Sequence, residues 1–90
     1  PAADLAVAMA LVSGYRDIPL DENLIAFGEI GLSGEIRSVS RVQSRINEAA
    51  RLGFTKCILP ISSVKQVSSC PESLELIGVR SLGQAISIIK

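Results

Sequence analysis

The side chains in this chain that could form a covalent intermediate are serine and tyrosine hydroxyls and two cysteine thiols, and the sequence contains no histidine to activate them. Covalent catalysis requires a nucleophile with a general base within hydrogen-bonding reach. Lysine is the remaining candidate base, but Lys56 and Lys65 follow different predicted elements, and no serine stands at a spacing that predicts a pair. The lack of histidine also excludes histidine-based acid–base catalysis and histidine ligation of a metal.

The two cysteines, Cys57 and Cys70, lie thirteen positions apart. Cys57 belongs to the apolar run Cys57–Leu59 and is predicted to be a small buried residue. Cys70 lies in a predicted loop. Two cysteines at this spacing without histidine form a poor metal site, and a disulfide is not expected in a cytosolic protein. We therefore expect this segment to hold no metal.

Two glutamates flank a predicted turn at Leu32–Glu35, with Glu29 before the turn and Glu35 at its end. If both faced one site they would resemble an acid–base pair. The simpler interpretation is that they are solvated or paired with Arg37 and Arg41, and this is the one we expect.

Four arginines fall within fifteen positions: Arg37, Arg41, Arg45 and Arg51. Arg41 and Arg45 are one helical turn apart, so a helix here would place them on one face. The simpler interpretation is a solvated face with salt bridges. The alternative is a phosphate-binding patch, which makes Arg37, Arg41 and Arg45 the candidate DNA-binding residues. With net charge +0 and 3% aromatic residues, we expect neither strong autonomous DNA binding nor base stacking.

Ninety residues with 48% apolar content predict one small domain with an aliphatic core. Hydrophobic periodicity predicts an α/β order of helix, hairpin, helix, strand, short helix, strand and helix, with parallel strands in the second half. The predicted ranges are helix Ala3–Tyr15, hairpin strands Leu24–Ile30 and Glu35–Val39, a helix from Ser40 to Gly53, strand Lys56–Leu59, a short helix from Ser63, strand Leu74–Val79 and a helix from Ser81. The S-x-x-Q sequences at Ser40, Ser63 and Ser81 predict capping boxes.

The first predicted helix is apolar nearly all round, which predicts burial on more than one side. We expect it to contact a partner surface or strands that precede it. Because the chain begins without methionine and enters a helix almost at once, we interpret it as a fragment of a longer protein, truncated at its N-terminus.

The stretch Phe27–Pro60 resembles the core of Lon-type serine–lysine peptidases, in which a TGEI-like strand, an L-x-G-x-(V/I) sequence and a lysine-bearing helix follow one another. The resemblance implies a Lon peptidase-like fold, also described as ribosomal protein S5 domain 2-like. It places Gln43 at the lysine position and Ala2 at the serine position. Because neither residue can act as base or nucleophile, the resemblance implies an inactive domain over residues 1–90.

Within that superfamily, the sequences PAADLAVAMAL, FGEIGLSGEIR and EAARLGF resemble the C-terminal domain of the RadA/Sms family of bacterial DNA-repair proteins. The resemblance implies a non-catalytic scaffold and auxiliary DNA-contact domain in a cytoplasmic protein that processes branched recombination intermediates. It implies a ring-shaped hexamer, with ATP, magnesium and zinc bound elsewhere in the parent. No apolar run reaches the roughly 20 residues that span a bilayer.

Two alternatives remain open at this point. One is the Lon-like domain of magnesium-chelatase-like AAA+ ATPases, which shares the GE-x-x-L-x-G pattern. The other is a Lon-type peptidase whose serine has been mutated, against which Gln43 argues.

Overall fold

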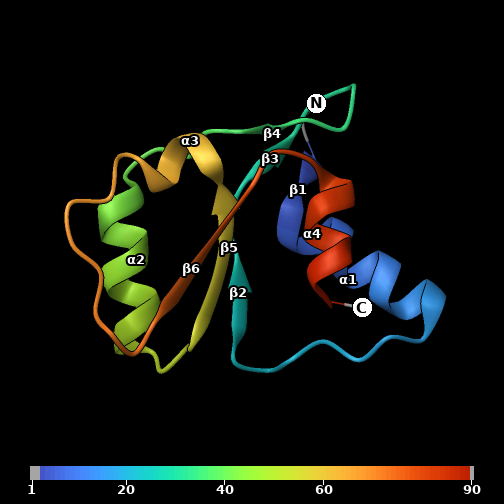
Figure 1. Ribbon diagram of the computed structural model, residues 1–90. Helices are drawn as coiled ribbons and strands as arrows, with labels where there is room; N and C mark the ends of the chain where they lie inside the picture. The colour runs from blue at the N-terminus through green and yellow to red at the C-terminus, as the bar shows by residue number, and fades with distance from the viewer. Residues whose placement is uncertain (1–2, 90) are drawn as a thin grey trace.

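The computed structural model describes residues 3–89, and its centre is a parallel sheet covered by helices on both faces (Figure 1). The sheet has the order β2-β5-β6, formed by Leu24–Ala26, Lys56–Pro60 and Glu75–Val79. Helix α2 (Val42–Arg51) covers one face, while α1 (Leu5–Arg16) and α4 (Leu82–Ile89) pack side by side on the other. The predicted α/β class and the parallel pairing in the second half are confirmed.

The central strand β5 supplies side chains to both faces of the sheet. Cys57 and Leu59 are fully buried against the α2 side, and Ile58 is fully buried against the α1 and α4 side. Alternate residues of a strand point to opposite faces, so a strand covered on both sides is apolar throughout. The core therefore has two halves separated by the sheet.

The first helix begins two residues later than predicted, because Ala3–Asp4 form strand β1 and Asp4 is the N-cap of α1. The Asp4 carboxylate accepts hydrogen bonds from the amides of Ala6 and Val7 at 2.8 and 3.2 Å. These bonds satisfy two of the amides that every helix start leaves without an intrahelical partner. The helix continues through Gly14 to Arg16 and ends at Asp17, which adopts the left-handed conformation.

The single strand predicted over Leu24–Ile30 is wrong, because two strands of different sheets occupy it. Strand β2 ends at Ala26, and β3 (Glu29–Ile30) joins a small antiparallel sheet of order β1-β3-β4, in which β4 is Ile36–Arg37. Between the strands, Gly28 has φ +151°, and a Cβ there would lie 2.9 Å from Cγ2 of Ile36. Only glycine fits such a close approach, so the chain changes sheets at this position.

The hairpin prediction holds for a shorter segment, since β3 and β4 pair antiparallel through a turn in which Gly34 has φ +84°. Of the three predicted capping boxes, the one at Ser81 is supported: its Oγ accepts the Gln84 amide at 3.2 Å. The box at Ser40 is wrong, because α2 starts at Val42 with Arg41 as an N-cap whose side chain makes no capping bond. The box at Ser63 is also wrong, because that residue lies inside α3 (Ile61–Val64).

Helix α2 otherwise follows its sequence pattern. Val42, Ile46 and Ala49 form its buried face, and Gly53, with φ +93°, follows the last turn as predicted. Within residues 3–89, no helix is long and apolar enough to cross a membrane.

Candidate functional site

Gln43 connects α2 to the loop before β6 through its side-chain amide. It is the residue that the Lon resemblance places at the lysine position. Its side-chain oxygen accepts the amides of Ser68 and Ser69 at 2.8 and 3.3 Å. Its side-chain nitrogen donates to the Ser69 carbonyl at 2.8 Å and to Asn47 Oδ1 at 3.0 Å. The expected capping role is therefore wrong, since the amide holds a loop in place. Ala2, the other degenerate position, lies outside the described residues.

The most buried hydroxyl of the described chain, Ser63, has a structural partner. Its Oγ is fully buried and accepts the Val39 amide at 3.0 Å, and the neighbouring Ser62 hydroxyl pairs with Ser38. These bonds fasten the segment after β4 to α3. Every buried side-chain nitrogen or oxygen of the described residues has a hydrogen-bond partner.

The two cysteines differ in environment, as expected. Burial raises the pKa of the Cys57 thiol to about 12, with a smaller contribution from the nearby Cys70. Cys57 therefore stays a neutral thiol at physiological pH. Cys70 is half-buried and donates to the Leu74 carbonyl at 3.3 Å. Both thiols are free, and residues 3–89 contain no cluster of three or more groups that could hold a metal ion.

The glutamates that flank the turn do not form an acid–base pair. Glu35 makes an ion pair with Arg37 at 3.7 Å and accepts the Ser33 amide at 3.1 Å, which confirms the expected pairing with Arg37. The expected pairing with Arg41 is not found within residues 3–89. Glu29 is exposed and stands opposite Arg37 in the β3–β4 ladder. Arg37 is therefore held by the hairpin and is separate from the arginines of α2.

The four arginines divide into two groups in the structure. Arg37 pairs with Glu35, and Arg51 pairs with Glu48. These are the ion pairs found within residues 3–89, so Arg41 and Arg45 have no carboxylate partner there. The Arg45 Nε donates to the Ser40 carbonyl at 3.0 Å, and its guanidinium lies 5.7 Å from the centre of the Phe27 ring.

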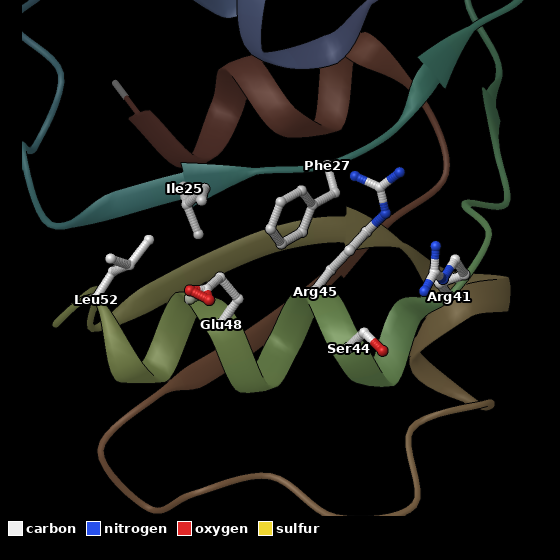
Figure 2. A pocket seen from close by; sticks show the side chains of 8 residues that line it. Ile25, Phe27, Arg41, Ser44, Arg45, Glu48 and Leu52 are labelled. Atoms are coloured by element: carbon white, nitrogen blue, oxygen red, sulfur yellow. The ribbon is translucent and has the colours of Figure 1, made fainter.

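Arg41 and Arg45 border a groove between β2 and α2 (Figure 2). The groove has a volume of about 340 Å³ and is lined by Ile25, Phe27, Arg41, Ser44, Arg45, Glu48, Ala49 and Leu52. Ile25 and Phe27 reach down from the strand, and Arg45 rises beside the Phe27 ring from the helix. The arginines stand toward the N-terminal end of α2, and the other end is lined by Ile25, Ala49 and Leu52 together with Glu48. A cationic end beside an apolar floor suits an anion that carries a flat apolar group.

Sequence reasoning identified Arg41 and Arg45 but missed Ile25 and Phe27. Both were predicted as strand residues, and the low aromatic content argued against stacking. The sequence offered one signal: Phe27 directly precedes Gly28, and a glycine inside a predicted strand can mark the place where the strand ends. Only the packing of β2 against α2 brings its ring to an arginine eighteen positions away.

Comparison with known proteins gives two kinds of match. The sequence model of the family described as subunit ChlI of Mg-chelatase matches residues 1–63. Proteins named DNA repair protein RadA match almost the whole chain: that of Streptococcus pyogenes serotype M1 is 45% identical over 99% of it, and that of Escherichia coli is 46% identical over 96%. The RadA protein of Streptococcus pneumoniae is 45% identical over 96%. The chain spans about a fifth of these relatives, covering 19%, 18% and 20% of their lengths respectively.

Proposed function

The chain belongs to the family described as subunit ChlI of Mg-chelatase, and from this membership and its RadA relatives we propose that it is a non-catalytic domain of a DNA repair protein. In this proposal it has the Lon peptidase-like fold and serves as a scaffold and auxiliary DNA contact in a cytoplasmic, ATP-dependent parent that processes recombination intermediates. ATP, magnesium and zinc would be bound by other parts of that parent. The observation that carries the proposal is 45% identity to RadA over 99% of the chain.

The contacts of Gln43 support a non-catalytic role. A general base must accept a proton near neutral pH, which a carboxamide cannot do, and this amide is engaged by the 68–69 loop and Asn47. The side chain at this position of α2 therefore serves packing. The alternative of a peptidase with a mutated serine requires a base at this position, and an amide cannot supply one.

The exposed face of α1 supports a scaffold role. Val7, Leu11 and Tyr15 recur at one-turn intervals with 58%, 70% and 92% of their surface exposed. A stripe of large apolar side chains left in solvent is typical of an interaction surface. We propose that it takes part in self-association of the parent into a ring.

Charge supports the DNA contact. Arg41 and Arg45 lack carboxylate partners within residues 3–89, and they stand where the first-turn amides of α2 carry the positive end of the helix dipole. Arginines placed in this way neutralise phosphates with release of counterions. Arg37, although paired with exposed Glu35, lies on the neighbouring hairpin and would extend the patch.

The test is the double replacement Arg41→Ala with Arg45→Ala in the intact parent protein. We expect DNA affinity to fall and the salt dependence of binding to weaken, by about 0.9 in the logarithmic slope for each duplex phosphate that the variant no longer neutralises. Ring assembly, followed by light scattering, should be unchanged. Wild-type affinity and salt slope in the double variant would refute the DNA contact.

A second candidate function rests on the family match over residues 1–63: the chain would be the Lon-like domain of a magnesium-chelatase-like AAA+ ATPase. The two candidates differ in the ATPase that accompanies the domain. A RecA-type ATPase module preceded by a four-cysteine motif in the parent supports the repair protein, and an AAA+ module supports the alternative.

A further inference from the structure

We propose that the groove between β2 and α2 binds single-stranded DNA, with one unstacked base lying against Arg45 and Phe27 and an adjacent phosphate at Arg41. The inference rests on the proposed DNA contact and specifies which form of DNA this site prefers. The inference starts from the lining of one groove (Figure 2). Arg41 and Arg45, which have no carboxylate partner within residues 3–89, lie in the same groove as the apolar side chains of Ile25 and Phe27.

The charge of the groove favours a polyanion. Arg41 and Arg45 meet no carboxylate in residues 3–89, while the one acidic residue of the lining, Glu48, is bonded to the Arg51 guanidinium. That bond lowers the pKa of the Glu48 carboxyl and compensates its charge locally. The net positive end of the groove is therefore free to bind phosphate, whose contacts with arginine are charge-assisted.

The cation–π contact of Arg45 with Phe27 favours a base. The guanidinium lies over the ring at 5.7 Å, and Arg45 is exposed, so its outer face is available to a second planar group. Unpaired bases stack on guanidinium planes and on aromatic rings when proteins bind single strands. The apolar side chains of Ile25, Ala49 and Leu52 continue the floor beyond that contact.

The size and geometry of the groove favour a single strand over a duplex. Its volume of about 340 Å³ lies at the lower end of the range of small-ligand sites, which spans roughly 300–1,000 Å³. A base in a duplex is paired and stacked, and its removal costs a few kcal/mol. An unpaired base avoids this cost, so the same phosphate contacts give tighter binding to a single strand.

The experiment is a fluorescence anisotropy titration of this chain with labelled oligothymidylate, a labelled hairpin duplex and an abasic oligodeoxynucleotide of equal charge. We expect the oligothymidylate to bind about tenfold or more tightly than the other two, because stacking contributes about 1–3 kcal/mol per base. The informative variant is Arg45→Lys, which keeps the charge and removes the planar guanidinium on which a base could stack. It should weaken oligothymidylate binding several-fold and leave abasic binding unchanged.

Phe27→Leu provides a second variant that keeps an apolar side chain and removes the ring, and it should act in the same direction. Arg16→Lys is the matched control for Arg45→Lys, because Arg16 lies at the end of α1 on the opposite side of the sheet. Thermal unfolding of each variant checks that it is folded.

The outcomes separate this inference from the broader proposal. Equal affinity for all three probes, with no effect of Arg45→Lys, would overturn the base-binding inference and leave a phosphate-binding patch. Binding of none of the probes by the wild-type chain would overturn both the inference and direct DNA contact by this segment.

Discussion

Gln43 and Arg45 stand two positions apart on α2, yet their side chains have opposite roles. Gln43 turns toward the body of the domain and makes four hydrogen bonds with Asn47 and the 68–69 loop. Arg45 turns toward the groove, where it has an aromatic neighbour and no carboxylate partner within residues 3–89. The Gln43 side of α2 is therefore structural, while the adjacent face of the same helix borders an open groove.

The largest expected effect comes from the buried side of α2. Ile46 is fully buried, and Ile46→Ala should lower the free energy of unfolding by about 2–5 kcal/mol because it leaves a cavity. The matched control is Leu52→Ala in the groove, since Leu52 is 60% exposed and its truncation should cost less than about 1 kcal/mol. Urea denaturation of both variants measures the difference, and equal destabilisation would contradict the division of α2 into a buried and an open side.

A smaller effect is expected from the polar contacts that Gln43 makes. Gln43→Ala should lower the free energy of unfolding by about 1–3 kcal/mol, because it removes the acceptor of the Ser68 and Ser69 amides. Hydrogen exchange of these two amides should accelerate in the variant. Gln43→Lys should show the same acceleration, because an ammonium group cannot accept those bonds. Retained protection in both variants would show that another contact holds the loop.

The exposed face of α1 offers a test of self-association that leaves folding intact. Leu11→Glu should reduce the mass of the parent assembly in light scattering, because a charge would enter the interface. Gln66→Glu is the matched control, since it adds the same charge at an exposed position outside α1. If the parent assembly has the same mass with Leu11→Glu as in the wild type at every concentration, α1 is not part of the assembly surface.

The smallest expected effect concerns the thiol beneath α2. Because the folded pKa of Cys57 is about 12 against an ordinary value of 9.0, its neutral thiol stabilises the fold fully below pH 9.0. This stability disappears as the pH rises from 9.0 toward 12, and the decrease amounts to about 1 kcal/mol by one unit above 9.0. Chemical denaturation of the wild type and of Cys57→Ser across this pH range measures how much the thiol contributes to the free energy of unfolding. At neutral pH, a thiol reagent should modify Cys70 well before Cys57, and the reverse order would contradict the burial.

The sequence predicted much of the architecture. Alternation and periodicity placed the parallel strands Lys56–Pro60 and Glu75–Val79 within one residue at each end. The strand predicted over Leu24–Ile30 failed at Gly28, and the capping predictions failed where a polar residue had two possible partners. Ser63 and Gln43 fit local capping patterns, but the first accepts the Val39 amide and the second binds the 68–69 loop.

The local sequence by itself determined the apolar strands, the glycine turns and the neutral amide at position 43, because these depend on residue type and near neighbours. Tertiary structure decided which arginine lies beside an aromatic ring. Arg37 pairs with Glu35 only two positions away, whereas Arg45 meets Phe27 only because β2 packs beside α2. Spacing along the chain describes contacts within one element, and a site assembled from two elements exists only after their hydrophobic faces have packed together.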